Sequence, residues 1–122
     1  MNIFEKTAHK YPTIVKEMCS AAISAGVRIM GVYSEDDFGV EIKEDDSPVT
    51  LADKISDKVI GDILKFEFPN IPIVSEESHC ELSSVMGEIY FLVDPLDGTK
   101  EFIKKTGEFT VNIALILNEK AE

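Results

Sequence analysis

Hydrophobic residues recur every three or four positions in two stretches of the chain, residues 11–31 and 50–68. In the first stretch these positions are Ile14, Met18, Ala22, Ala25 and Ile29. In the second they are Leu51, Ile55, Val59, Ile63 and Phe66. This spacing places side chains on one face of a helix. The pattern therefore predicts two amphipathic helices, the second of which ends at Pro69 and Asn70.

Four other stretches have the composition of β-strands. Residues 38–43 alternate between apolar and polar side chains, which predicts a strand that forms half of a hairpin with the polar turn after it. Residues 72–74 form a short apolar run, whereas residues 89–93 and 109–117 are longer and rich in β-branched and aromatic side chains. We expect the last strand to be mostly buried. Helices and strands together predict one α/β domain.

The chain has 122 residues and a formal net charge of −11, from 12 basic and 23 acidic side chains. This balance argues against non-specific binding to nucleic acid. It does not exclude a small phosphate-bearing ligand, because a bound metal ion inverts the local charge. The sequence has no stretch typical of a signal peptide or a membrane span, so we expect a cytoplasmic protein, with the inner face of the membrane as an alternative location.

The cysteines and histidines have no spacing typical of metal ligands. Cys19 and Cys80 lie far apart in sequence, and we expect two reduced, unpaired thiols. For His9 and His79 we expect surface or loop positions.

Two carboxylates follow the apolar stretch 89–93 directly. Asp94 and Asp97 are three residues apart, with Pro95 between them and Gly98 after them. Proline fixes one backbone angle and glycine permits a tight turn, so both acids can be held in a single rigid loop. Clustered carboxylates repel each other unless a cation or a proton lies between them, and oxygen ligands suit Mg²⁺. The alternative is that both acids cap a turn.

A third carboxylate, Glu76, follows the apolar run 72–74 as Asp94 follows its own strand. If both strands belong to one sheet, the two acids converge at the same edge, where α/β folds bind ligands. The alternative is a solvated pair formed by Glu76 and Glu77 in a loop.

Asp53 stands three residues after Thr50, the spacing of a helix capping box. In the functional alternative, Asp53 accepts a hydrogen bond from Thr99 or from water and helps to deprotonate the nucleophile. We expect the two roles to be compatible only if the carboxylate points away from the helix end.

Residues around the acidic turn offer further contacts. The amides of Gly98 and Thr99 are candidates to bind a phosphate at a helix N-terminus. Lys100 fits either a surface position or a contact with that phosphate. The acidic runs at 35–37 and 44–46 are typical of a solvated face.

Three segments taken together, residues 47–53, 74–77 and 94–102, resemble the lithium-sensitive, Mg²⁺-dependent phosphatases of the inositol monophosphatase superfamily. The sequence Thr-Lys-Glu-Phe at 99–102 is similar to that of the 3′(2′),5′-bisphosphate nucleotidases of the CysQ type. The resemblance covers nearly the whole chain. It implies a layered α/β/α/β/α sandwich, of which residues 1–122 supply the N-terminal portion, with two helices packed on a mostly antiparallel sheet.

The resemblance also implies a role for each acid. Glu76, Asp94, Asp97 and the backbone carbonyl of Leu96 would be ligands of Mg²⁺, and Glu77 would support them.

By the same resemblance, Asp53 and Thr99 would orient and activate the attacking water. Gly98, Thr99 and Glu76 would contact the substrate.

The implied substrate is 3′-phosphoadenosine 5′-phosphate, which loses its 3′-phosphate to give AMP. Inositol-1-monophosphatase activity is the alternative within the same superfamily. A third reading is a non-catalytic chain that binds metal or phosphate without turnover.

The chain departs from the family pattern in one respect. A later Trp-Asp motif of the family supplies a further metal ligand, whereas this chain has no tryptophan and no aspartate after Asp97. We therefore expect a fragment, or a chain completed by a partner. We also expect residues 1–122 alone to have little or no phosphatase activity and to self-associate through the strand at 109–117.

Overall fold

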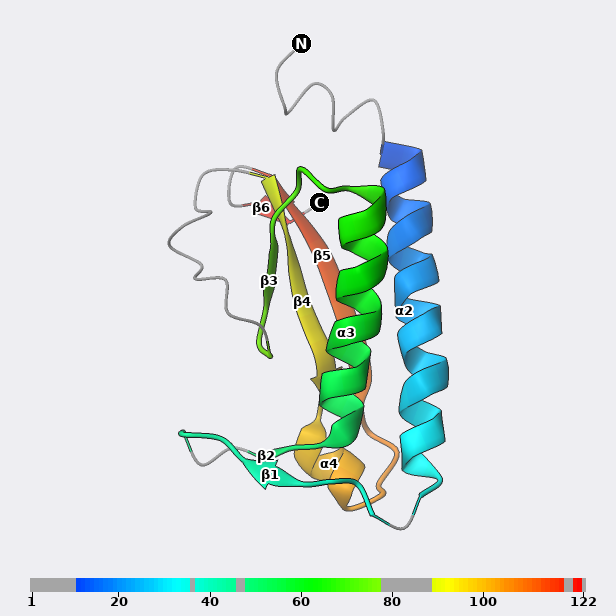
Figure 1. The fold of residues 1–122 in the computed structure, drawn as a ribbon, viewed down its shortest axis with the longest axis vertical. Coiled ribbons are helices and arrows are strands. Elements are labelled where there is room, and N and C mark those ends of the chain that lie inside the picture. Colours follow the sequence, from blue (N-terminus) through cyan, green and yellow to red (C-terminus); the bar gives the residue numbers. More distant parts are fainter. Residues whose placement is uncertain (1–10, 36, 46–47, 78–88, 118–119, 122) are drawn as a thin grey trace.

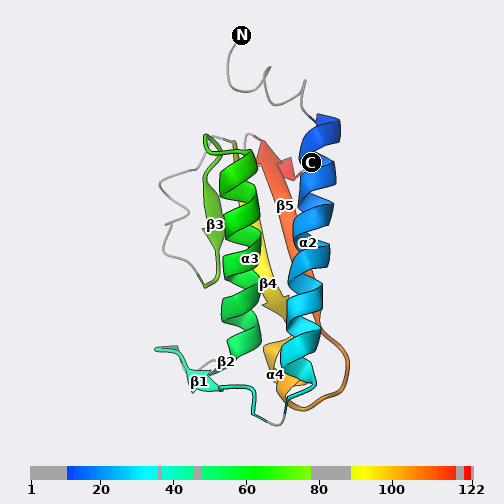
Figure 2. The same cartoon turned by 45° about the vertical axis from the view of Figure 1, so that its right-hand side comes forward.

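The computed structural model describes residues 11–35, 37–45, 48–77, 89–117 and 120–121. Two helices cover one face of a sheet, as Figures 1 and 2 show from two directions. The predictions for His9, His79 and Cys80 fall outside the described residues. Cys19 is an exposed free thiol. No helix in the described part of the chain has the length and hydrophobicity needed to cross a membrane.

The elements follow one another in the order helix, hairpin, helix and sheet. The helices are α2 (Tyr11–Tyr33), α3 (Leu51–Glu67) and α4 (Thr99–Ile103). The strands are β1 (Glu41–Ile42), β2 (Pro48–Val49), β3 (Ile73–Ser75), β4 (Ile89–Asp97), β5 (Thr110–Leu117) and β6 (Lys120–Ala121).

The main sheet has the strand order β3-β4-β5-β6. Its β3–β4 pair is parallel, and its β4–β5 and β5–β6 pairs are antiparallel. A separate two-stranded sheet is formed by β1 and β2, which pair antiparallel. The expectation of two helices packed on a mostly antiparallel sheet is therefore confirmed.

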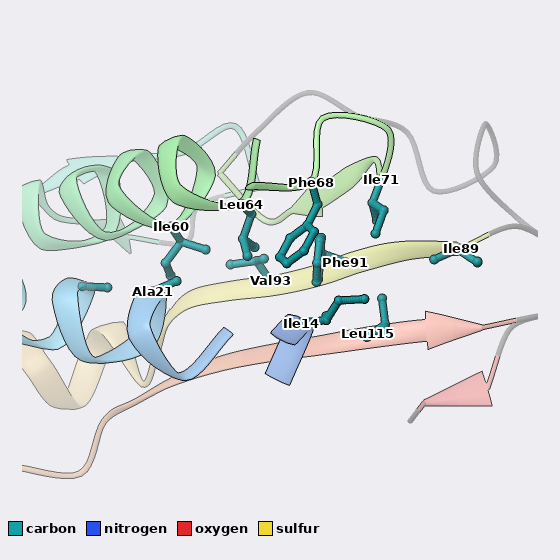
Figure 3. Packing of buried hydrophobic residues seen from close by; sticks show 11 residues of the cluster. Ile14, Ala21, Ile60, Leu64, Phe68, Ile71, Ile89, Phe91, Val93 and Leu115 are labelled. Atoms are coloured by element: carbon teal, nitrogen blue, oxygen red, sulfur yellow. The ribbon is translucent and has the colours of Figure 1, made fainter. Parts of the chain in front are cut away.

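The main hydrophobic core lies between the two long helices and the sheet. Ile14 of α2, Ile60 and Leu64 of α3, and Phe91 and Val93 of β4 are all less than 2% exposed. Figure 3 shows these side chains meeting between the layers. Burying this apolar surface fixes the distance of the helices from β4, the strand that ends in the acidic motif.

The buried face of α3 differs from the face predicted by its hydrophobic residues. Leu51 is 45% exposed and Phe66 is 83% exposed. The buried positions are instead Ala52, Asp53, Ser56, Ile60 and Leu64. Two of them are polar, so a pattern of apolar residues alone places the core face about one residue too early.

The strands also differ from their predicted lengths. The first hairpin strand is limited to Glu41–Ile42, whereas β4 continues beyond residue 93 to Asp97, with a register shift between Asp94 and Asp97. In β5 only Leu115 and Ile116 are buried, so the expectation of a mostly buried strand was wrong. Among the described residues, β6 covers only the last two positions of β5.

Gly98 joins β4 to α4 in a conformation that favours glycine. Its φ angle is +97°, in the left-handed region. A Cβ atom at this position would lie 2.6 Å from the carbonyl oxygen of Glu108 and 3.2 Å from the Cα of Phe109. The turn therefore depends on the absence of a side chain.

We predict that Gly98→Ala lowers the free energy of unfolding by about 1–3 kcal/mol, because it adds backbone strain and a contact with Glu108. Gly26→Ala is the matched control, since nothing lies within 4 Å of its added Cβ. In the interior of α2 this change should raise stability by about 0.5–1 kcal/mol. Urea denaturation measures both effects, and equal stability of the two variants would contradict the role of Gly98.

Candidate metal and phosphate site

The acids expected at a common sheet edge follow paired positions of β3 and β4. The two strands run parallel, and Ser75 lies opposite Val93. The backbone N–H of Glu76 donates to the carbonyl of Val93 at 3.4 Å. Glu76 and Asp94 therefore directly follow paired residues of the parallel strands β3 and β4. The strand β4 continues to Asp97 and leads into α4 (Figure 1).

The electrostatics of Asp94 reflect this crowding. Its pKa is raised above 3.8, first by burial and then by the negative charges of Glu76 and Asp97, with a smaller effect from Asp53. A divalent cation would relieve this repulsion, and carboxylate oxygens are suitable ligands for Mg²⁺. Within the described residues, however, no three acidic, histidine or cysteine side chains form a ready metal-binding cluster. The shared ion of Glu76, Asp94 and Asp97 stays a prediction.

Asp97 is held by the neighbouring strand. Asn112 donates through Nδ2 to Asp97 Oδ2 at 3.3 Å, and it lies opposite Asp94 in the β4–β5 register. Sequence reasoning missed Asn112. The sequence nevertheless marks Asn112, since it is the one polar side chain between Val111 and Leu117 in a predicted β-strand.

Asp53 makes both of the hydrogen-bonding contacts considered for it, with Thr50 and with Thr99. Its side chain is 1% exposed. One oxygen, Oδ2, accepts from the N–H of Thr50 at 2.7 Å and from Thr50 Oγ1 at 2.6 Å. The other oxygen, Oδ1, accepts from Thr99 Oγ1 at 2.8 Å. The expected condition, a carboxylate turned away from the helix end, was therefore wrong, because one oxygen caps the helix while the other accepts from Thr99. A part of Asp53 in activating water stays a prediction.

Two further side chains of α3 fix the ends of β3 and β4. Ser56 Oγ donates to the carbonyl of Pro95 at 2.7 Å, and Ser75 Oγ donates to Asp57 Oδ1 at 2.5 Å. Together with Asp53 they occupy positions i, i+3 and i+4, which share one helix face. This face contacts all three motif segments. Sequence reasoning overlooked Ser56 and Asp57, although their spacing from Asp53 was visible.

Glu77 is bound to the first hairpin. Lys43 Nζ lies 3.2 Å from Glu77 Oε1, and the backbone N–H of Glu77 donates to Ser75 Oγ at 3.2 Å. Burial lowers the pKa of Lys43, but the hydrogen bond and the charges of Glu77, Asp45 and Glu76 outweigh it and raise the pKa above 10.5. Glu77 is thereby held in place beside Glu76.

The remaining predicted residues surround the acidic turn. Leu96 has a buried side chain, and its carbonyl lies 3.4 Å from Thr99 Oγ1. Gly98 is the N-cap residue of α4, and no side chain caps this helix end. Lys100 is exposed, as are the described members of the acidic runs, Glu35, Asp37, Glu44 and Asp45.

Two hollows open beside the acids. One of about 390 Å³ is lined by Glu76, Asp94 and Asn112 among others. A second of about 520 Å³ is lined in part by Asp97 and Gly98. The site therefore has open space next to Asp94 and next to Asp97.

The chain is similar to curated bisphosphate nucleotidases. It is 42% identical over 118 residues to the 3′(2′),5′-bisphosphate nucleotidase CysQ of Buchnera aphidicola. The aligned segment covers 95% of this chain and 44% of the relative. It is 48% identical over 106 residues to CysQ of Escherichia coli K12, covering 84% of this chain and 43% of the relative. The chain thus spans less than half the length of these relatives.

Solved structures agree with this relationship. The crystal structure of CysQ from Bacteroides thetaiotaomicron, a bacterial member of the inositol monophosphatase family, superposes with a TM-score of 0.73 at 39% identity, covering 89% of this chain and 40% of that one. The suhB protein of Bartonella henselae superposes with a TM-score of 0.76 at 31% identity, and the match covers 89% of this chain and 41% of that one. The profile of the inositol monophosphatase family matches residues 11–122, and the chain therefore belongs to that family.

Proposed function

We propose that this chain supplies the metal- and phosphate-binding part of a Mg²⁺-dependent phosphatase that converts 3′-phosphoadenosine 5′-phosphate to AMP. The observation that carries the proposal is the hydrogen bond from Thr99 to Asp53. It forms near Asp94, whose pKa is raised by burial and by the charges of Glu76 and Asp97. The names of the CysQ relatives support the substrate class.

Glu76, Asp94, Asp97 and the carbonyl of Leu96 would hold Mg²⁺ in this proposal. When bound, the ion neutralises phosphate charge and lowers the pKa of a coordinated water. The net charge of −11 makes such neutralisation necessary, because an anionic substrate otherwise meets an acidic protein.

Thr99 and Asp53 would position the attacking water. A threonine hydroxyl has one proton, and the 2.8 Å bond to Asp53 Oδ1 uses it. The lone pairs of Thr99 Oγ1 are then directed to accept a hydrogen bond from water. The carboxylate of Asp53 increases the basicity of that oxygen, which favours proton removal from the water. The amides of Gly98 and Thr99 would contact the phosphate.

A second candidate is inositol-1-monophosphatase activity. The similarity to solved inositol monophosphatases favours it, for example the enzyme from Anabaena, with a TM-score of 0.71 at 28% identity. The higher identity to CysQ proteins and the Lys100-Glu101 pair favour the nucleotidase. A non-catalytic binding role is the third candidate.

We predict that residues 1–122 alone release no phosphate above background. The joined protein, in which residues 1–122 are followed by the part of E. coli CysQ after its matched segment, should hydrolyse 3′-phosphoadenosine 5′-phosphate with Mg²⁺. It should do so at least about tenfold faster than inositol 1-phosphate. A phosphate-release assay measures both rates, with intact E. coli CysQ as the control. The reverse preference would favour the monophosphatase, and a folded joined protein that binds Mg²⁺ without turnover would favour the binding role.

Asp94→Asn in the joined protein should reduce the rate at least about a hundredfold, because it removes a charge that would hold the metal. Asp62→Asn is the matched control, since Asp62 lies on the exposed side of α3 in an ion pair with Lys58. The rates are measured as a function of Mg²⁺ concentration. Full activity of Asp94→Asn would remove Asp94 from the ligand set.

Thr99→Val in the joined protein should lower kcat at least about a hundredfold and leave Mg²⁺ binding intact, because it removes the hydroxyl between Asp53 and the water. Thr99→Ser keeps this hydroxyl and should retain most of the activity. Steady-state kinetics and calorimetry with Mg²⁺ separate the two effects. Equal losses in both variants would assign Thr99 a packing role instead.

A further inference from the structure

The turn that follows β3 carries Glu76, a predicted metal ligand whose own side chain is exposed. Packing therefore does not fix this carboxylate, and its position follows from the backbone on either side of it. The residues before and after it are both held. Ser75 is 6% exposed, and Glu77 Oε1 lies 3.2 Å from Lys43 Nζ.

The Ser75 hydroxyl joins these two neighbours to α3. Its single proton is donated to Asp57 Oδ1 at 2.5 Å, and the same oxygen accepts from the backbone N–H of Glu77 at 3.2 Å. A hydrogen bond to a carboxylate is stronger than one between neutral groups, and it makes the hydroxyl a better acceptor for the second bond. Asp57 thus completes a chain of two hydrogen bonds that spans the backbone of Glu76.

The helix places Asp57 for this contact. It stands one turn after Asp53, about 6 Å further along the axis, on the same helix face. Asp53 accepts from Thr99 at 2.8 Å, while Asp57 accepts from Ser75. Two acids of one helix therefore set the spacing between Thr99 and the turn that carries Glu76.

Small cations depend most strongly on such a spacing. Mg²⁺ requires near-ideal octahedral geometry at about 2.0–2.1 Å, whereas Ca²⁺ accepts about six to eight oxygens at about 2.3–2.6 Å in flexible arrangements. A carboxylate whose turn has come loose should therefore lose more affinity for Mg²⁺ than for Ca²⁺.

We propose that Asp57 is a positioning residue that tunes this site for Mg²⁺ over larger cations. Through Ser75 it fixes the turn that carries Glu76, without being a ligand itself. The inference rests on the proposed function, since it needs Glu76 as a ligand. The alternative is a purely structural role, in which Asp57 only attaches β3 to α3.

Two neutral variants of the joined protein separate the hydrogen bond from the charge. Asp57→Ala removes both, whereas Asp57→Asn removes the charge but keeps an oxygen that accepts from Ser75. Asp57 lines an open hollow of about 680 Å³ between α3 and β3, so Asp57→Ala leaves no closed void. Asp62→Asn is the matched control, because it removes a charge from the exposed side of the same helix.

Calorimetry without nucleotide measures the Kd of each variant for Mg²⁺ and for Ca²⁺. We expect Asp57→Ala to raise the Kd for Mg²⁺ at least about tenfold, because it removes support from a ligand, and the Kd for Ca²⁺ less than about threefold. Asp57→Asn should raise the Kd for Mg²⁺ less than about threefold, since the hydrogen bond remains. Asp62→Asn should leave both values within about twofold of those of the unaltered protein.

Equal losses of Mg²⁺ affinity in Asp57→Ala and Asp57→Asn would overturn the proposal, because the charge and not the hydrogen bond would then be responsible. So would equal losses for Mg²⁺ and Ca²⁺, or unchanged Mg²⁺ affinity in Asp57→Ala, which would leave Asp57 a structural role. If Asp57→Ala does not fold, Ser75→Ala removes the same hydrogen bond from the other side and is judged by the same criteria. Ser75→Thr, which keeps the hydroxyl, then replaces Asp57→Asn.

The outcome is separable from that of the proposed function, because Asp94→Asn is titrated alongside. If Asp94→Asn loses Mg²⁺ binding while Asp57→Ala binds as the unaltered protein does, the proposed metal site stands and the role of Asp57 fails. If the unaltered joined protein binds no Mg²⁺, the metal site itself fails, and this inference fails with it.

Discussion

The polar face of α3 is the constraint on which the site depends. Asp53 binds Thr99 of α4, Ser56 binds Pro95 of β4, and the third member, Asp57, binds the end of β3. A typical hydrogen bond of this kind contributes about 1 kcal/mol, but leaving one buried partner unsatisfied costs about 1–3 kcal/mol. No buried side-chain nitrogen or oxygen in the described part of the chain lacks a partner. Two segments far apart in sequence, the end of β3 and residues 95–99, are therefore positioned by a single helix.

The sequence predicted the elements better than the faces that they bury. Periodicity located α3, and the capping box at Thr50 marked its start, because both depend on neighbouring residues. The buried face was placed wrongly because Asp53 and Ser56 are polar, and only their distant partners explain their burial. The strand β4 was ended too early because Pro95 predicts a turn. In the fold this proline lies where the β4–β5 register shifts, and there the N–H that proline lacks is not needed.

The same hydrogen bonds hold the acids together against their repulsion. Asp53 is compensated, since its oxygens accept three hydrogen bonds. Asp94 is compensated less, because the hydrogen bond from the backbone of Leu96 does not offset burial and the charges around it, and its pKa is raised. Groups fixed in this way need little rearrangement when charge of the opposite sign arrives, which is the condition for electrostatic preorganisation. Asp53 is thus suited to work through Thr99, whereas Asp94 is suited to a cation.

The strand β5 connects this site with an apolar groove that lies between α2 and β5. Its alternate residues face in opposite directions, so Asn112 reaches Asp97 while Ile113 and Leu115 line the groove. A shift of β5 by one residue would exchange these two sets of side chains. Packing of Ile113 and Leu115 against the core beneath the helices therefore fixes the register that holds Asp97.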